Sequence, residues 1–162
     1  MQVKRIAGAL GAEIKGVDLG QILTPEISIV IRDLLNEHEV LFFRQQAIEP
    51  AQQRDLAAIF GPLQTHPAYG TVAGIPEVMI LESTVDKPSK IEVWHSDMTF
   101  RQHPPSVTVL RGMVIPNVGG DTLFASMYAA YDTLSAPIRK MLEELTAQHS
   151  FERGWGSTYG MF

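Results

Sequence analysis

The chain has 162 residues, 45% of them hydrophobic and 19% charged, which is enough for one globular domain with its own core. Thirteen basic and eighteen acidic residues give a net charge of -5, which argues against the basic surface of a nucleic-acid-binding protein. There is no cysteine, so disulfides and thiolate metal sites are excluded, and any metal must be held by His, Asp or Glu.

The N-terminal residues show neither a signal peptide nor an apolar run long enough to span a membrane, and we expect a cytoplasmic protein without membrane partners. Residues 6–19 alternate apolar side chains with glycines, which predicts short strands and a turn. Gly8 and Gly11 lack the full spacing of a phosphate-binding loop, so turn glycines are the favoured interpretation.

A helix is predicted after residue 24, because Thr24 is a typical N-cap, Pro25 suits the first helical position and Glu26 favours the first turn. The helix should end near His38, a basic residue placed well at the negative end of the helix dipole. Apolar residues at helical spacing predict its buried face: Ile27, Val30, Ile31, Leu34 and Leu35.

Residues 40–44 form a short apolar run and predict a buried strand. Pro50 then begins a second helix over residues 51–60, which the Gly61-Pro62 pair ends. A loop follows that carries His66 and Tyr69, where a structural histidine capping a backbone carbonyl is the alternative to a binding role. Residues 78–81 predict another strand, and the polar residues 84–90 predict a loop.

The second half of the chain begins with a β-rich stretch, residues 106–115, followed by a dense turn signal over residues 116–121. Residues 122–125 predict one more strand, and residues 126–131 predict a helix. A last helix should begin at Ser135, and its apolar residues fall on one face: Ile138, Met141, Leu142 and Leu145.

Residues 94–100, with the sequence WHSDMTF, place an imidazole and a carboxylate two positions apart. On an extended backbone alternate side chains share a face, so His95 and Asp97 should point the same way. Neutral imidazole with a carboxylate suits Fe(II), Mn(II) or Zn(II), and two histidines with one carboxylate leave open positions in non-haem Fe(II) oxygenases. A bare His-x-Asp is a weak motif, and a structural histidine is its alternative interpretation.

Several segments together resemble the TauD/TfdA family of Fe(II)- and 2-oxoglutarate-dependent dioxygenases, and the resemblance covers essentially the whole chain. The segments are WHSDMTF at 94–100, Pro104-Pro105, GGDTLF at 119–124, Ala129-Ala130-Tyr131 with Leu134-Ser135, VLFFRQQ at 40–46 and FGPL at 60–63. The resemblance implies a mainly β fold with flanking helices, a cupin-like double-stranded β-helix (jelly roll). It also implies hydroxylation of a small substrate, with 2-oxoglutarate converted to succinate and CO2.

The resemblance also implies roles for particular residues. His95 and Asp97 would be catalytic metal ligands for Fe(II), and Thr122 would donate its hydroxyl to 2-oxoglutarate. Four residues would bind or enclose the substrate: His66, Tyr69, Phe100 and Trp155. His66 and Tyr69 favour a substrate with an anionic end, such as taurine, another sulfonate, a sulfate ester or a carboxylate.

The chain departs from the family where the second histidine ligand and the 2-oxoglutarate-binding arginine are expected, because both lie beyond its last residue. Only His103 and His149 follow Asp97; His103 sits in a proline turn, and His149 matches a position that is not a ligand. We therefore expect residues 1–162 to be one domain that lacks its C-terminal strands. Without those strands, sheet edges and apolar faces would be uncovered. We expect this to lead to a homo-oligomer or to a fold of low stability.

Three other interpretations remain open. The chain is a catalytically incomplete jelly-roll binding domain, or a Zn(II) metallohydrolase, or a β-rich domain whose His95 is structural. The family resemblance favours the dioxygenase, with a small-molecule substrate, 2-oxoglutarate and O2 as its partners. Ile91 and Gly154 replace polar residues that taurine dioxygenase has near its substrate, so the primary substrate stays open.

Overall fold

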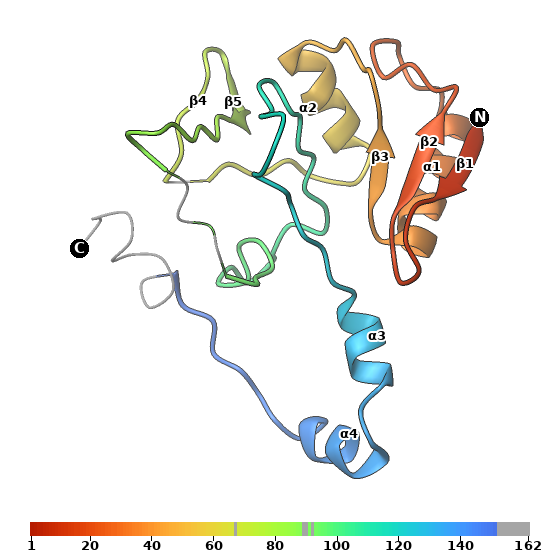
Figure 1. The fold of residues 1–162 in the computed structure, drawn as a ribbon, viewed down its shortest axis with the longest axis vertical. Coiled ribbons are helices and arrows are strands. Elements are labelled where there is room, and N and C mark those ends of the chain that lie inside the picture. The colour runs from red at the N-terminus through yellow and green to blue at the C-terminus, as the bar shows by residue number, and fades with distance from the viewer. Residues whose placement is uncertain (67, 89–90, 92, 152–162) are drawn as a thin grey trace. The chain divides into compact units, whose positions relative to one another are not determined.

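The computed structural model describes residues 1–66, 68–88, 91 and 93–151 (Figure 1). The chain divides into two compact units. The first contains Met1–Gln52 and Leu110–Thr146, and the second contains Gln53–Val109 and Ala147–Phe162. Within the described residues, no helix has the length and apolar character needed to cross a membrane.

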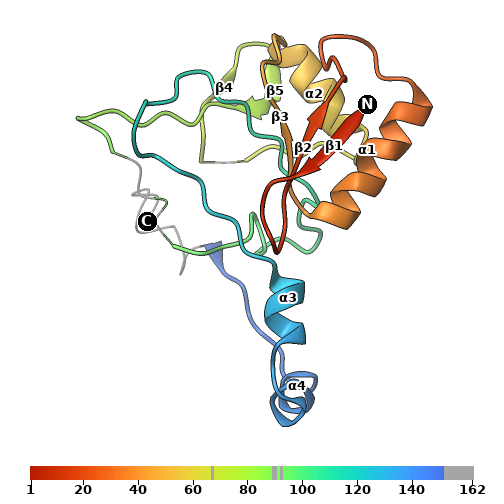
Figure 2. The ribbon, with the colours of Figure 1, turned by 45° about the vertical axis from the view of Figure 1, so that its right-hand side comes forward.

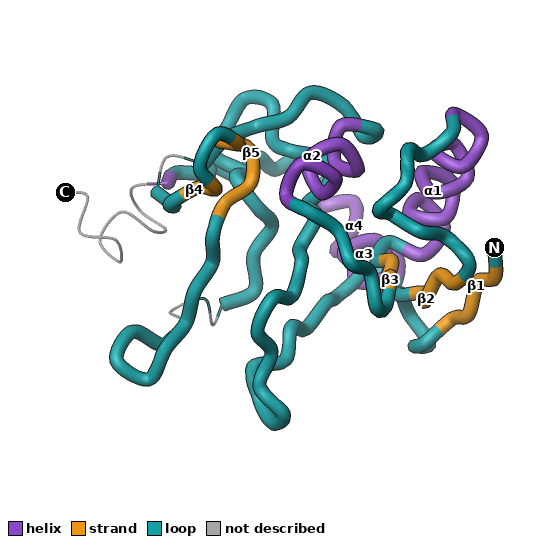
Figure 3. The backbone as a smooth tube through the Cα atoms, turned by 90° about the horizontal axis from the view of Figure 1, so that it is seen from above, coloured by secondary structure: helices purple, strands orange, loops and turns teal. Residues whose placement is uncertain are grey.

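The first unit is built on a small three-stranded sheet in the order β1-β2-β3, seen from above in Figure 3. β1 (Gln2–Arg5) pairs antiparallel with β2 (Ala12–Lys15), and β2 pairs parallel with β3 (Leu41–Phe43). The turn between β1 and β2 closes where the Ile6 N–H donates to the Gly11 carbonyl at 3.1 Å, and Gly11 has a φ of 98°. The predicted turn and one predicted strand, β2, are therefore confirmed within residues 6–19, whereas β1 lies ahead of that range. Gly11 supplies a left-handed conformation that other residues adopt at a cost.

Helix α1 (Pro25–His38) begins and ends where the sequence predicts, and Figure 2 shows it beside the sheet. Thr24 is the N-cap and accepts the Ile27 N–H at 3.4 Å. Ile31 is only 1% exposed and anchors the helix, whereas Val30 is 37% exposed, so its predicted burial is wrong. Apolar burial in this unit comes chiefly from the sheet, α1 and the loops beside them: Ala12, Ile14, Leu19, Ile31 and Ile48.

Helix α2 (Pro50–Ala58) runs from the first unit into the second and is two residues shorter than predicted. Its last turn tightens, because the N–H groups of Ile59, Phe60 and Gly61 each donate to the carbonyl three residues earlier. Leu56 is buried as expected, and Ile59 and Phe60 are half-buried.

The second unit has one short hairpin in its described residues, and the rest of those residues are mostly loop. β4 (Thr71–Val72) pairs antiparallel with β5 (Ile75–Met79). β5 begins three residues earlier than the predicted strand and ends at Met79, with Val78 buried.

Figure 1 labels helices α3 (Met127–Asp132) and α4 (Ala136–Leu142), which confirm that two helices form late in the chain. Both belong to the first unit, and α4 ends before Leu145, which was expected on its apolar face. Neither helix has a buried residue. The attachment lies ahead of them, where Ser126 donates to Glu39 Oε1 at 2.8 Å and the Phe124 ring meets Phe42 edge-on at 6.2 Å.

The strands predicted for residues 106–115 and 122–125 are wrong, because the structure forms neither. A strand requires a neighbour for its backbone N–H and C=O groups, and the described residues offer no such neighbour to these segments. Most of their apolar side chains are exposed, with Val114 at 92% and Leu123 at 71%. More of the described residues lie in helices than in strands, so the mainly β composition is not found in this part of the chain.

Candidate metal centre and substrate loop

His95 and Asp97 meet in the second unit, as the sequence predicts, although the segment that carries them is not a strand. His95 Nε2 lies 3.3 Å from Asp97 Oδ1, and the two side chains are 35% and 46% exposed. The backbone is irregular through residues 94–96 and then turns, with Met98 at a φ of 49° and the Arg101 N–H donating to the Met98 carbonyl at 3.0 Å. The open backbone before this turn lets residues i and i+2 face each other.

Each of the two groups is oriented by a hydrogen bond on its far side. His95 Nδ1 lies 2.8 Å from the Val93 carbonyl, which can only accept, so Nδ1 donates the hydrogen bond and Nε2 is the ring nitrogen that faces Asp97. Thr108 Oγ1 donates to Asp97 Oδ2 at 2.7 Å, which leaves Oδ1 facing His95. Outer partners of this kind are typical of metal-ligating histidines and carboxylates.

This arrangement fits a metal ion through two donors. A neutral imidazole nitrogen and a carboxylate oxygen are both metal-ligating atoms, and His95 Nε2 and Asp97 Oδ1 lie 3.3 Å apart. Within the described part of the chain, no group of three His, Cys, Asp or Glu residues is placed to hold a metal ion. His149 Nδ1 lies 2.9 Å from Thr99 Oγ1, so this histidine is within hydrogen-bonding distance of the segment that follows Asp97.

The predicted substrate residues His66, Tyr69 and Phe100 fall in one aromatic cluster of the second unit. The His66 and Tyr69 rings have centroids 4.7 Å apart. Phe151 joins the cluster from the far end of the described chain, 5.9 Å from His66 and 5.0 Å from Phe100. The rings give an apolar wall beside a polar imidazole, which suits a small substrate with one charged end.

The His66 imidazole is half-buried, and burial is the main reason that its pKa is lowered from the usual 6.5. The charge of Arg101 lowers the pKa further, whereas Asp97 acts in the opposite direction. The Ala68 N–H donates to His66 Nδ1 at 3.1 Å. This histidine therefore accepts a backbone N–H, whereas the alternative interpretation had it capping a carbonyl.

Two of the predicted site residues are not placed with the others. Thr122 is exposed and belongs to the first unit, so its contact with 2-oxoglutarate stays a prediction. Trp155 lies outside the described residues. Sequence reasoning missed Arg101, Thr108 and Phe151, because their partners are 11 to 85 positions away and no local pattern points to them.

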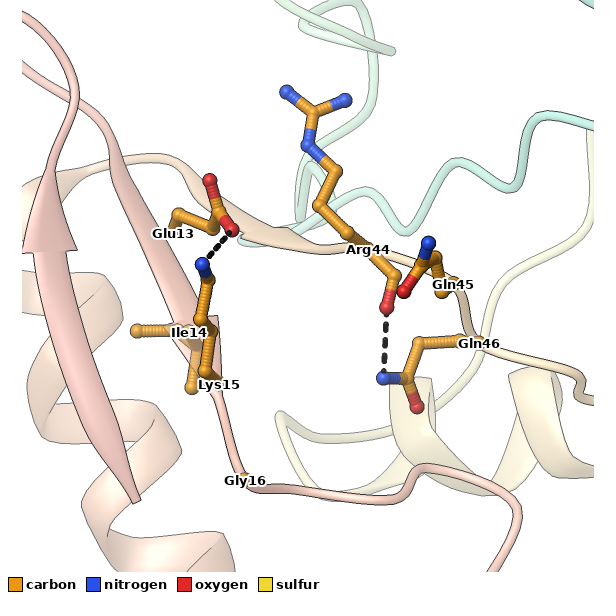
Figure 4. A pocket seen from close by; sticks show the side chains of 7 residues that line it. All are labelled: Glu13, Ile14, Lys15, Gly16, Arg44, Gln45 and Gln46. Atoms are coloured by element: carbon orange, nitrogen blue, oxygen red, sulfur yellow. Dashed lines mark hydrogen bonds and ion pairs between the residues drawn. The ribbon is translucent and has the colours of Figure 1, made fainter.

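The first unit has a hollow of about 630 Å³ beside the ends of β2 and β3, and it contains none of the predicted site residues. Polar side chains at its rim are engaged with their neighbours: Lys15 pairs with Glu13 at 3.3 Å, and Gln46 donates to the Arg44 carbonyl at 3.2 Å (Figure 4). The hollow is open to solvent and shows no converging set of donors for a ligand.

Sequence comparison finds relatives that match nearly the whole of this chain. The chain is 36% identical over 157 residues to an alkylsulfatase of Acinetobacter baylyi, with 96% of this chain and 49% of the relative covered. It is 34% identical over 158 residues to an α-ketoglutarate-dependent sulfate ester dioxygenase of Pseudomonas putida, covering 97% and 52%. The chain thus spans about half the length of the curated relatives it matches.

Solved structures are also similar to most of this chain. A taurine dioxygenase from Burkholderia xenovorans superposes with a TM-score of 0.77 at 39% identity, covering 88% of this chain and 51% of that one. The model of the taurine catabolism dioxygenase TauD, TfdA family matches residues 2–159. The chain therefore belongs to the TauD/TfdA family.

Proposed function

We propose that this chain supplies the first two metal ligands and the substrate loop of an Fe(II)- and 2-oxoglutarate-dependent dioxygenase. The observation that carries the proposal is the approach of His95 Nε2 to Asp97 Oδ1, 3.3 Å apart, with each group oriented from behind by a hydrogen bond. The family assignment supports the same activity. The enzyme would hydroxylate a small anionic organic substrate and release succinate and CO2.

Iron bound with 2-oxoglutarate would supply the activation of O2, and the residues of this chain would hold, orient and shield the reactants. His95 Nε2 and Asp97 Oδ1 would hold the metal. The Val93 carbonyl would fix the tautomer of His95, and the Thr108 hydroxyl would fix the rotation of the carboxylate.

The substrate end of the site would be formed by the aromatic cluster. His66 would donate a hydrogen bond to an oxygen of the anionic group, with Tyr69 beside it. Phe100 and Phe151 would exclude water from the apolar part of the substrate. Thr122 would donate its hydroxyl to 2-oxoglutarate, and Trp155 would lie over the substrate.

Sulfonates and sulfate esters are the proposed substrate class, because both present a three-oxygen anionic head to which an imidazole N–H can donate. Two relatives, an alkylsulfatase and a sulfate ester dioxygenase, support this class. Taurine and small carboxylates are the next candidates. We also propose that the whole domain folds as a jelly roll and that the protein is located in the cytoplasm.

The test is an anaerobic titration of the purified chain with Fe(II) and 2-oxoglutarate, followed by the visible metal-to-ligand charge-transfer band. The band should form in the native chain and be lost in Asp97→Ala and His95→Ala. Asp86→Ala is the matched control, because Asp86 is an exposed carboxylate in a loop of the same unit. Its substitution removes the same charge as Asp97→Ala.

Equal bands in Asp97→Ala and Asp86→Ala would contradict the assignment of Asp97 as a ligand. Absence of the band at saturating Fe(II), with binding of an alkyl sulfate retained, would favour the catalytically incomplete binding domain instead. The two outcomes separate a wrong ligand from a site that this chain does not assemble.

A further inference from the structure

The loop that carries His66 is fastened to the segment that follows Asp97 by three hydrogen bonds. Arg101 donates through Nη1 to Gln64 Oε1 at 3.0 Å and through Nη2 to the Thr65 carbonyl at 2.8 Å. Gln64 donates in return to the His103 carbonyl at 3.1 Å. These bonds join positions 36 to 39 residues apart, so they fix two loops that no strand pairing holds together.

The planar guanidinium suits this task, because it directs two parallel N–H groups at two acceptors on one loop. A lysine would keep the charge and lose this fork. Arg101 is half-buried, and its acceptors are the side chain and the carbonyl of the two residues just before His66. The position of the imidazole therefore depends on Arg101 without a direct hydrogen bond between them.

The His66 ring is also fixed in its tautomer. A backbone N–H can only donate, so His66 Nδ1, which receives the Ala68 N–H at 3.1 Å, carries no proton in this geometry. The proton of the neutral ring is then on Nε2. The ring is packed against Tyr69 at 4.7 Å and Phe151 at 5.9 Å.

The charged groups that act on this imidazole are Arg101 and Asp97, and Tyr69 is the further titratable side chain beside it. Burial and the guanidinium both disfavour the imidazolium, and the single carboxylate opposes them. The balance keeps the pKa of His66 below its ordinary value, which agrees with the tautomer that the Ala68 N–H requires.

We propose that Arg101 is a positioning residue for substrate recognition: it holds the loop of residues 64–66 so that His66 meets the anionic end of the substrate as a neutral Nε2–H donor. Recognition then uses one directed hydrogen bond from an uncharged ring. The inference rests on the proposed function for its substrate and on the hydrogen bonds alone for the state of His66.

Ring-nitrogen NMR of the ¹⁵N-histidine-labelled chain tests the state of His66 without metal or substrate, with the signal assigned through His66→Gln. The native chain should show an Nε2–H tautomer and a titration midpoint below that of free histidine. Arg101→Met should raise the midpoint and populate the other tautomer. Arg32→Met is the control, because Arg32 is an exposed residue of α1 in the other unit, and it should leave both readings unchanged.

Binding of hexyl sulfate to the chain with Fe(II) and 2-oxoglutarate under anaerobic conditions tests the recognition step. Arg101→Met and Arg101→Lys should both weaken binding by roughly tenfold, the loss expected for one well-placed hydrogen bond to a charged group. Any rise of the native affinity on acidification should have its midpoint at a lower pH than the ordinary value of histidine, and this midpoint should move up in Arg101→Met.

Gln64→Met keeps the charge of Arg101 and removes one of its acceptors, so it serves if Arg101→Met does not fold. It should raise the fraction of the wrong tautomer with a smaller shift in midpoint. A native His66 that is Nδ1–H, or that titrates at or above free histidine, would overturn the inference, as would unchanged signals in Arg101→Met. Correct NMR behaviour with no hexyl sulfate binding in any variant would instead reject the proposed substrate class.

Discussion

Two regions of the molecule are stabilised in different ways: the β1–β3 sheet with helix α1, and the loops that carry the candidate site. Around the sheet, apolar side chains are almost completely buried, with Ala12, Ile14 and Ile31 at 0%, 2% and 1% exposure. In the loops of residues 64–66 and 97–108, individual polar bonds at 2.7 to 3.1 Å connect segments that have no regular secondary structure.

The contrast separates stability from site geometry. Buried apolar groups contribute free energy without much direction, whereas hydrogen bonds contribute less and fix orientation. We therefore expect changes around the sheet to alter the free energy of unfolding, and changes in the loops to alter ligand binding at nearly constant stability.

The largest effect should come from Ile31→Ala in α1. Removing this fully buried side chain should lower the free energy of unfolding by about 2–5 kcal/mol, from lost apolar burial and the cavity left behind. Ile29→Ala, in the same helix at 48% exposure, is the matched control and should cost under about 1 kcal/mol. Urea unfolding measures both, and equal losses would show that α1 does not anchor the unit.

The next effect should come from Thr108→Val, which keeps the shape of the side chain and removes the donor to Asp97 Oδ2. A freely rotating carboxylate should weaken metal binding by about 10–100-fold, the usual cost of losing an outer partner of a ligand. Mn(II) binding followed by electron paramagnetic resonance measures the change, with Thr71→Val in β4 as the control. Unchanged Mn(II) affinity would show that Thr108 does not orient the carboxylate.

The difference between the two regions also explains what the sequence could predict. α1 was predicted to within a residue because Thr24, Pro25 and Glu26 act locally, and its end at His38 needs only the next residues. The His95 and Asp97 pair was predictable for the same reason, since two positions of open backbone decide where the side chains point.

Features that depend on distant partners were not predictable. Residues 106–115 have the composition of a strand, but a strand needs another segment beside it, which a local pattern cannot supply. Nothing in the sequence around Arg101 indicates Gln64 as its acceptor, because the two residues are 37 positions apart. Phe151 reaches Phe100 across 51 positions, a contact that only the folded chain reveals.

A smaller effect is expected at the attachment of α3 in the first unit. Ser126 is buried, accepts the Ala129 N–H at 3.1 Å as an N-cap and donates to Glu39 at 2.8 Å. Ser126→Ala should therefore lower the free energy of unfolding by about 1–2 kcal/mol. Ser135→Ala is the control, because this N-cap of α4 makes no capping bond with its side chain, and a loss of the same size there would show that the Ser126 bonds add nothing.

The smallest effect concerns pH and the loop of His66. The folded-state pKa of His66 lies below the ordinary 6.5, so between the two values the unfolded chain binds more protons than the folded chain. Stability from this residue is complete above pH 6.5 and is lost as the pH falls through that value toward the folded-state pKa. His66→Gln should therefore flatten part of the fall in melting temperature between about pH 7.5 and about pH 5, whereas His103→Gln, at an exposed position of the same unit, should not. Because the imidazole is only half-buried, solvent screening keeps the difference in melting temperature between the variants small. If the melting temperature falls identically with pH in the native chain and in both variants, His66 lies in water and does not pack against Tyr69 and Phe151.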